Sequence, residues 1–540
     1  MSKLCLQYRN HDAFNERRIT TMESWTARFN ERPPKIIQGG MGIAVSSWHL
    51  ARRVAQLGEF GVVSGTGIDT VVVRELQQGD PHGRLRALQA YPDQEIVDYL
   101  IGRFFLEAGI GENIPYKLLP MHRYKPTTRS QRLLSAAAFS EVFLAKEGHD
   151  GLIGINLLGK LKRYSLACIY GAMLAGVDAI LMGAGIPVEE AEQLPLLAAG
   201  EKARLRLDVD TSKASNPKAS YYYELDPADL VPHPPQMRCP MFFPIVALDT
   251  LARILDKKLA AGLITGFIIE GPVAGGHNAP PRSKTYDADS NPVYDERDVA
   301  NLDQVAALGY PFYLAGGYGS PGKLKEALEQ GATGIQVGSL FSLANESGYP
   351  MAYKRTLIKK IHEGTTSVRT DGRISSTGFP FKVLEVEGTL GIPQLYKERT
   401  RICDLGYLQQ AYVDEKDRLQ VRCPAEPVAT YVDKGGNVED TERRGCLCNA
   451  LMANIGLGQL QKGGREKQLF TAGDDLVNLP LGSVDHPSYT TQDVIQYLYG
   501  MKKSEPPMER SDGSMDVVLG QRVGVGGGGA GEPVGDRTLE

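Results

Sequence analysis

The sequence predicts an α/β protein built on a (β/α)8 TIM barrel, with a helical insertion and a smaller, irregular C-terminal domain. Short apolar runs bounded by Gly or Pro recur eight times, and helix-forming stretches lie between them. Eight alternations of strand and helix favour a closed barrel of buried parallel strands. The expected strands are 35–40, 60–65, 151–158, 178–185, 241–248, 266–272, 311–317 and 334–341.

Helices are expected between these strands because apolar residues recur three and four positions apart, the spacing of one helix face. The clearest example is WHLARRVAQLG, which follows the first strand. Comparable patterns follow the third, fifth and seventh strands. The four helical segments are 48–58, 161–176, 249–262 and 320–331.

The barrel should extend over residues 34–365 of the 540-residue chain, which is longer than the roughly 250 residues of a plain barrel. The excess is assigned to three insertions: a helix-rich one at about 70–150, a Pro-rich one with a possible extra strand at 200–240, and a polar one at 282–300. The third follows the sixth strand directly. It is interpreted either as a lid over the barrel mouth or as a decorative surface loop.

Three further segments flank the barrel. Residues 1–33 form an N-terminal extension, in which Met22 could be an alternative start. Residues 366–500 are punctuated by Cys, Gly and Pro, which indicates an irregular domain packed on the barrel. Residues 501–540 are rich in Gly and poor in aromatic residues, so a disordered tail is expected there.

The composition limits the partners. Lys and Arg total 60 and Asp and Glu total 64, a net charge of −4, so no overall positive field attracts nucleic acid or an anionic membrane. No apolar run approaches the roughly 18 residues of a membrane span, and the N-terminus does not resemble a secretory signal. A cytoplasmic protein with a small-molecule substrate is expected, and its oligomeric state stays open.

The ends of the seventh and eighth strands suggest a phosphate site. Gly316 and Gly317 follow the seventh strand, and Gly338 and Ser339 follow the eighth. Because glycine has no Cβ, backbone N–H groups there can approach a phosphate closely. The alternative is that these glycines only terminate strands.

A glycine pair with a histidine follows the sixth strand. In GPVAGGHNAPP, Gly275 and Gly276 allow a sharp turn that presents His277 at the barrel mouth. Histidine suits proton transfer because its ordinary pKa is about 6.5. A structural histidine is the alternative.

Amides and glycines at the ends of the first and third strands could hold a flat heterocycle. Gln38 and Asn156 offer donors and acceptors, and Gly39, Gly40 and Met41 permit close stacking.

Taken in order, PPKIIQGGMG, FGVVSGTG, GINLL, EGPVAGGHNAP, PFYLAGGYGS and GATGIQVGSLF resemble the nitronate monooxygenase (2-nitropropane dioxygenase-like) family of FMN-dependent barrels. The resemblance covers about residues 34–345 and extends to the related FMN-dependent enoyl reductases. It implies bound FMN, with His277 beside the flavin as the catalytic residue. The cofactor-binding residues that it implies are Gln38, Gly39, Gly40, Met41, Asn156, Gly275, Gly276, Gly316, Gly317, Gln336, Gly338 and Ser339.

Two reactions are implied. The first is nitronate oxidation, in which O2 converts an alkyl nitronate to a carbonyl compound and nitrite. The alternative is NAD(P)H-dependent reduction of an enoyl thioester in polyketide or fatty-acid synthesis, with an acyl carrier protein as a possible partner. The insertion and the long C-terminal region resemble the longer bacterial members of the nitronate monooxygenase family, and they also resemble the trans-acting enoyl reductases of polyunsaturated fatty-acid and polyketide synthesis. A third hypothesis is a non-catalytic flavin-binding sensor or scaffold.

Four of the seven cysteines cluster late in the chain. Four thiolates could bind zinc or an iron–sulfur cluster and so stabilise a region with little core of its own. Their spacing is not that of a common zinc motif, and buried free thiols are the alternative. The four are Cys403, Cys423, Cys446 and Cys448.

Overall fold

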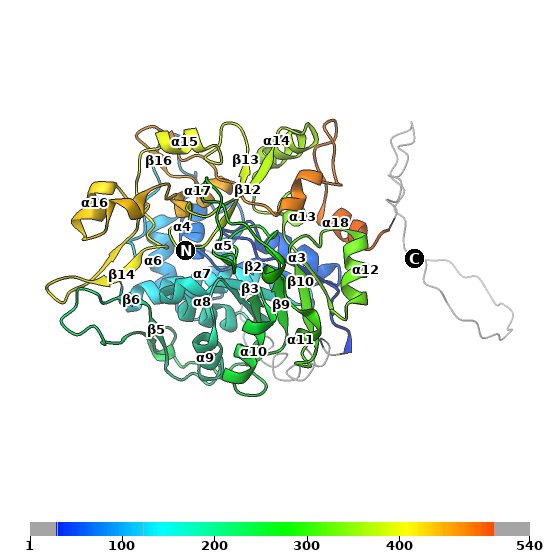
Figure 1. Ribbon diagram of the computed structural model, residues 1–540. Helices are drawn as coiled ribbons and strands as arrows, with labels where there is room; N and C mark the ends of the chain where they lie inside the picture. Colours follow the sequence, from blue (N-terminus) through cyan, green and yellow to red (C-terminus); the bar gives the residue numbers. More distant parts are fainter. Residues whose placement is uncertain (1–28, 30, 123, 502–540) are drawn as a thin grey trace, which may run out of the picture. The chain divides into compact units, whose positions relative to one another are not determined.

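The computed structural model describes residues 29, 31–122 and 124–501, and its centre is a barrel of eight parallel strands (Figure 1). All eight expected strands are confirmed, each slightly shorter than its apolar run. They are β1 (Ile36–Gln38), β2 (Gly61–Ser64), β3 (Ile153–Leu158), β4 (Ala179–Gly183), β8 (Met241–Val246), β9 (Phe267–Glu270), β10 (Phe312–Ala315) and β11 (Gly334–Val337).

The strands are ordered β1-β11-β10-β9-β8-β4-β3-β2, and every pairing between them is parallel. The two ends of this order also meet. The Gln38 N–H donates to Phe60 O at 2.9 Å, and the Phe60 N–H donates to Ile36 O at 3.1 Å. These bonds close the ring, so the predicted (β/α)8 class is confirmed.

Alternate residues of the strands fill the barrel interior, because successive side chains of a strand point to opposite faces. One hydrophobic cluster gathers these inward residues, and its large members are fully buried. The interior is therefore a packed core, and a ligand can be held only at an end of the barrel. Members of the cluster include Ile37, Phe60, Val62, Leu181, Phe243, Ile268 and Tyr313.

The helices predicted between the strands are also confirmed. Helix α12 begins with Ser320 as the N-cap, whose side chain accepts from the Lys323 N–H, and with proline at the first helical position. The barrel helices and short 3-10 turns are α3 (Trp48–Gln56), η1 (Gly159–Leu161), α8 (Lys162–Leu174), α9 (Val188–Ala198), α10 (Asp249–Lys258), α11 (Leu302–Ala306), α12 (Pro321–Glu329) and α13 (Ser339–Ser342).

The first insertion is helical, as expected. Helices α7 and α8 pack so closely that a Cβ on Gly171 would lie 2.0 Å from Ser135 O. The buried Arg84 guanidinium pairs with Glu75 at 2.6 Å and also contacts Glu141, so the charges within this helical layer are compensated. The helices are α4 (Ile68–Gln77), α5 (Arg84–Gln89), α6 (Gln94–Phe104) and α7 (Thr128–Lys146).

The second insertion contains an antiparallel hairpin of β5 (Ala203–Leu207) and β7 (Tyr221–Leu225), then η2 (Pro227–Asp229). The expected extra strand is therefore present. Between them, β6 (Val209–Asp210) pairs with a strand of the C-terminal region. The third insertion carries η3 (Glu296–Asp298), and the Arg282 N–H donates to Asp298 Oδ1 at 2.7 Å.

The C-terminal region belongs to the same compact unit as the barrel. In Figure 1 its yellow and orange elements lie on one side of the barrel, and α9, α10 and α11 lie on the opposite side. The expected tail at 501–540 lies outside the described residues except for Met501, as does most of the N-terminal extension. The elements are α14 (Met351–His362), β12 (Ser367–Asp371), β13 (Phe381–Glu385), α15 (Pro393–Glu398), β14 (Gln410–Val413), β15 (Leu419–Arg422), α16 (Val428–Asp433), η4 (Val438–Thr441), α17 (Leu447–Asn454), β16 (Leu460–Gln461), β17 (Gly464–Arg465), η5 (Asp474–Asn478) and α18 (Thr491–Leu498).

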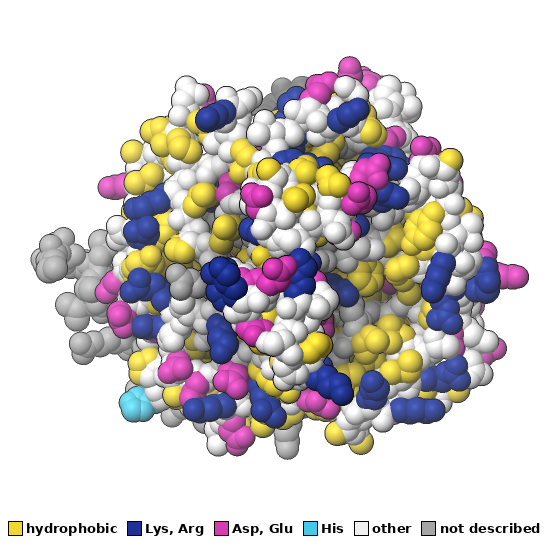
Figure 2. All heavy atoms as spheres, turned by 60° about the vertical axis from the view of Figure 1, so that its left-hand side comes forward, with side chains coloured by type: hydrophobic (Ala, Val, Ile, Leu, Met, Phe, Trp, Pro, Cys, Tyr) yellow, Lys and Arg dark blue, Asp and Glu magenta, His cyan; other side chains and the backbone are white. Residues whose placement is uncertain are grey.

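The surface shown in Figure 2 carries Lys and Arg side chains interspersed with Asp and Glu, and small apolar areas lie between them. Within the described residues, no helix combines the length and apolar character needed to cross a membrane.

Candidate active site

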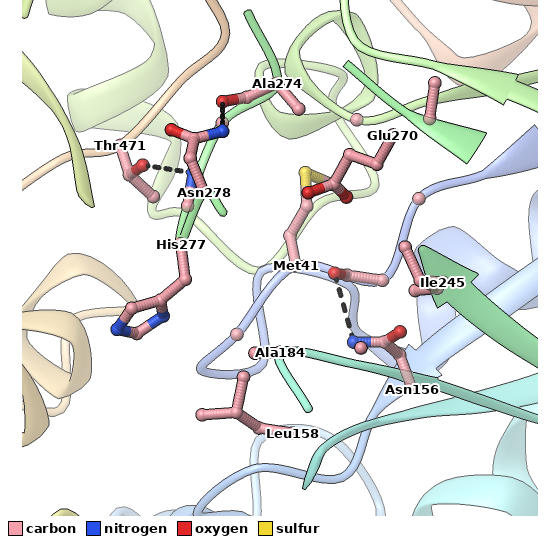
Figure 3. Close-up of a pocket in the computed structure, with 18 of the residues that line it drawn as sticks. Met41, Asn156, Leu158, Ala184, Ile245, Glu270, Ala274, His277, Asn278 and Thr471 are labelled. Atoms are coloured by element: carbon pink, nitrogen blue, oxygen red, sulfur yellow. Dashed lines mark hydrogen bonds between the residues drawn. The ribbon is translucent and has the colours of Figure 1, made fainter. Parts of the chain in front are cut away.

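A cavity of about 420 Å³ lies at the carboxyl ends of the barrel strands. Its walls are the loops that follow β1, β3, β4, β8, β9, β10 and β11, and segments of the C-terminal region cover it. Figure 3 shows side chains from several of these loops facing one space. This is the end of the barrel where ligands of such folds bind.

The loop after β1 forms one wall through Gly39, Gly40 and Met41. It is held from behind by Ser46, whose hydroxyl accepts from the Met41 N–H at 2.8 Å and donates to Gly39 O at 2.8 Å. The Gln38 amide donates to the same hydroxyl at 2.7 Å and accepts from the Val62 N–H at 3.1 Å. Gln38 is fully buried and is not part of the cavity wall, so its role is to position this loop.

Asn156, at the carboxyl end of β3, lines the cavity beside this loop. Its Nδ2 donates a long bond to Gly40 O at 3.5 Å, and its Oδ1 is buried without a protein partner. A Cβ on Gly40 would lie 2.1 Å from the Asn156 Cβ, so only glycine fits at this close approach.

The glycine loops after β10 and β11 also line the cavity. Gly316 and Gly317 adopt left-handed backbone with φ of 83° and 80°, a conformation that favours glycine. After β11, the Ser339 hydroxyl accepts from the Gly473 N–H of the C-terminal region at 2.8 Å. The Gln336 amide faces the same cavity, and its Oε1 is buried without a protein partner.

His277 lies at the edge of the cavity, on a loop that the C-terminal region holds in place. Its Nε2 is 2.7 Å from the Ser375 hydroxyl, and its ring packs edge-on against Phe381 with the ring centres 4.8 Å apart. The Gly276 N–H donates to the Thr471 hydroxyl at 2.8 Å. Burial lowers the pKa of His277 to about 4, so the imidazole is neutral near pH 7.

Glu270, the last residue of β9, was not among the site residues predicted from the sequence. It lines the cavity, and Figure 3 shows its carboxyl group near Met41. Burial raises the pKa of Glu270 to about 7, so the acid and carboxylate forms coexist near neutral pH. A signal was present, because an acidic residue ends an otherwise apolar strand at the edge of the barrel where ligands bind.

The covering segments were also missed. Phe379, Tyr407, Cys448 and Thr471 reach the cavity from the C-terminal region, and Ser375 contacts it through His277. These residues are about 100 to 200 positions from the motif that they complete, and no local pattern marks them. The polar insertion 282–300, interpreted as a possible lid, contributes no residue to the cavity wall.

The four late cysteines surround a separate cavity of about 10 Å³. Within the described part of the chain, no group of three or more His, Cys, Asp or Glu side chains is arranged to hold a metal ion. A tetrahedral zinc site requires four sulfurs about 2.3 Å from one centre. The cysteines therefore do not fit zinc.

The main cavity does fit FMN. Two unpartnered amide oxygens, on Asn156 and Gln336, can accept from a heterocycle with N–H groups, and the glycine loops leave backbone space for a phosphate. With the exception of Gln38, every cofactor residue expected from the sequence lines this cavity, and so does His277.

The fold and this cavity define a barrel that can hold an aromatic, phosphate-bearing ligand at its strand ends. Residues 219–380 match the family model described as nitronate monooxygenase, which confirms the resemblance for that part of the chain. A dehydrogenase of Mycobacterium tuberculosis is 31% identical to this chain over 132 residues, which is 24% of this chain. It is named for a hydroxy-methyl-oxo-octahydro-indene-carboxyl-CoA. The match spans about a third of that relative, 32% of its length. These matches support an oxidoreductase.

Solved structures give weaker likenesses. FabK from Thermotoga maritima is 16% identical with a TM-score of 0.45, and the match covers 88% of this chain and 94% of FabK. A nitroalkane oxidase from Streptomyces ansochromogenes is 14% identical with a TM-score of 0.39, covering 88% and 97%. At these scores the likenesses carry no functional argument.

Proposed function

We propose that this chain is an FMN-dependent oxidoreductase that reduces an α,β-unsaturated thioester with NAD(P)H. The proposed dependence on FMN rests on one observation. The glycine loops after β1, β10 and β11 and the unpartnered oxygens of Asn156 and Gln336 all line one cavity. When bound, FMN would carry hydride from NAD(P)H to the β-carbon of the substrate.

The charge of the cavity favours a thioester. The described residues that line it include no Lys or Arg. His277 is neutral near pH 7, and Glu270 is partly ionised. An anionic nitronate would find no positive side chain in this wall, whereas an enoyl thioester is neutral where it reacts. The relative from M. tuberculosis is named for a CoA thioester, which supports the same substrate class.

The residues of the chain would then have distinct roles. Ser375 holds the His277 ring through Nε2, so Nδ1 is the nitrogen that remains for the substrate. Glu270 would donate the proton that the α-carbon needs after hydride addition, and water would reprotonate it, because its pKa of about 7 suits transfer in both directions. The thioester would be presented by CoA or by an acyl carrier protein.

Nitronate oxidation is the second candidate. It is favoured by the description of the matched family model, which covers the loop that carries His277. In that reaction His277 would orient the nitronate beside the flavin.

An anaerobic visible spectrum separates the candidates. With NADPH we expect the flavin absorbance to bleach, and addition of crotonyl-CoA should restore it. Bleaching by propionate 3-nitronate alone would replace the thioester proposal with the second candidate. A bound flavin that neither donor reduces would refute both and support the non-catalytic binder.

A further inference from the structure

Solvent reaches the main cavity at one side. Among the described residues that line it, Ile186 and Ala279 are exposed, and Ile186 keeps 54% of its surface accessible. They belong to the loops that follow β4 and β9. Another part of the wall, which includes Phe381, Tyr407 and Leu447 of the C-terminal region, is buried. A ligand therefore enters beside Ile186 and Ala279 and meets a closed wall further in.

This closed wall is apolar. It comes from residues 381–451, a stretch that the structure describes throughout, and none of the residues of this stretch that line the cavity carries a charge. A hydrocarbon chain gains free energy when it leaves water for such a surface. The six residues, called the apolar wall below, are Phe381, Tyr407, Leu408, Leu447, Cys448 and Leu451.

The hydroxyl of Tyr407 does not make this wall polar, because its hydrogen bonds go to α4. It lies 2.6 Å from the Thr70 Oγ1 and donates to the buried Asp69, whose other oxygen is 2.6 Å from His122 Nε2. Neither Thr70 nor Asp69 lines the cavity. A buried polar network with its bonds made is rigid, so the Tyr407 ring is held at a fixed place in the wall.

A second, small cavity lies behind the apolar wall. It has about 10 Å³, roughly the space that one water needs. Leu408, Leu447 and Cys448 line both cavities, so their side chains form the partition between them. Leu447 is fully buried within a hydrophobic cluster of the C-terminal region, whereas Leu408 and Cys448 are half-buried. These two are the members of the partition that can change with less effect on packing.

His277 lies between the opening and the apolar wall. It precedes the exposed Ala279 by two residues, and its ring packs edge-on against Phe381 of the wall. A thioester that reacts beside His277 has a polar end, CoA or a carrier protein, that must remain in solvent. Its acyl chain is apolar and extends from the reacting carbons in the other direction. The opening suits the polar end, and the apolar wall suits the acyl chain.

We propose that the apolar wall binds the acyl chain of the substrate and that Leu408 and Cys448 limit the chain length that the enzyme accepts. This inference rests on the proposed function, because the thioester substrate supplies the acyl chain. It adds a determinant of specificity in the C-terminal region, which covers a barrel site of more general design.

The test compares the binding of butyryl-CoA and octanoyl-CoA, which are saturated and cannot be reduced, to the flavin-loaded full chain by calorimetry. Leu408→Ala removes part of the partition and makes room for about two more methylene groups, each worth about fourfold in binding. The affinity for octanoyl-CoA relative to butyryl-CoA should therefore rise about tenfold. Cys448→Leu adds bulk to the same partition and should lower this ratio. If Leu408→Ala does not fold, Cys448→Leu still decides the inference.

Leu251→Ala is the matched control. Leu251 of α10 is also half-buried and lines the main cavity, but it comes from the barrel and does not line the small cavity. Its substitution should leave the ratio of affinities unchanged. A higher ratio in Leu251→Ala together with an unchanged ratio in Leu408→Ala would place the acyl chain on the barrel side and overturn the inference.

Reoxidation of the reduced flavin by crotonyl-CoA distinguishes this inference from the proposed function. If crotonyl-CoA reoxidises the wild-type flavin and the ratio of affinities is the same in all variants, only the acyl-chain inference is wrong. If neither crotonyl-CoA nor 2-octenoyl-CoA reoxidises the flavin, the proposed function is wrong and this inference fails with it.

Discussion

Glu270→Gln should change the stability of the protein only where the wild-type carboxyl group is ionised. The folded pKa of Glu270 is raised from 4.5 to about 7 because burial disfavours the charged form. A group with a raised folded pKa contributes its stability fully below the unfolded pKa, and that contribution is lost as the pH rises through the folded value. Glutamine has no such dependence.

The magnitude follows from the two pKa values. Each pKa unit corresponds to about 1.4 kcal/mol, so the difference between 4.5 and about 7 is worth about 3 kcal/mol. Water inside the cavity would screen the charge, which makes this an upper value. Relative to wild type, Glu270→Gln should gain no stability from this effect at about pH 4, and up to about 3 kcal/mol above about pH 8.

The assay is urea unfolding of flavin-free protein at about pH 5, 7 and 9, with the free energy of unfolding compared at each pH. Glu329→Gln is the matched control, because this side chain is 65% exposed on α12, where its ion pair with Lys325 contributes little to the free energy of unfolding. If the gain from Glu270→Gln were the same at all three pH values, burial would not be what raises the pKa of Glu270.

Three further changes test the cavity. Gly317→Val should weaken FMN binding at least tenfold, because the position has φ of 80° and its Cβ would lie 3.0 Å from Val273 Cγ2. The control Gly331→Val, at φ 81° with open space around it, should lose similar stability and still bind FMN. Equal FMN affinity of the two variants, measured by fluorescence titration, would contradict the phosphate placement. Asn156→Leu should weaken FMN binding by about 1–3 kcal/mol, because it removes the buried amide oxygen that has no protein partner. The flavin-free variant should be at least as stable as flavin-free wild type. A less stable flavin-free variant would indicate that Asn156 has a structural role instead. Burial lowers the pKa of His277 to about 4, so its stability contribution is present above about pH 6.5 and is lost as the pH falls toward 4. The melting temperature of His277→Asn should therefore fall less than that of wild type over this pH interval. An identical fall in the two proteins would refute a neutral buried imidazole.

The sequence was sufficient for the barrel and for most of the cavity wall. Each strand is a local apolar run, and each connecting helix shows a local periodicity, so neither requires knowledge of distant contacts. Because parallel strands of a barrel place their carboxyl ends at one rim, the residues after each run were also expected to meet. Asn156, Gly317 and His277 were found in this way.

Other features depended on tertiary contacts. The Gln38 amide points away from the cavity and donates to the Ser46 hydroxyl. The pattern QGGMG could not predict this orientation, because Ser46 lies eight residues after Gln38 and outside the pattern. Glu270 was visible as an acid at a strand end, but its raised pKa arises from burial by several loops.

The C-terminal region shows the limit most clearly. The sequence predicted a shared site for four cysteines as one of two alternatives, with zinc or an iron–sulfur cluster, and free thiols were the other. The sizes of the cavities and the contact between Ser375 and His277, 98 residues apart, come from the packing of irregular loops. Short-range patterns determined the barrel because its elements are locally encoded, and only the tertiary structure determined the covering of the site because those contacts join distant segments.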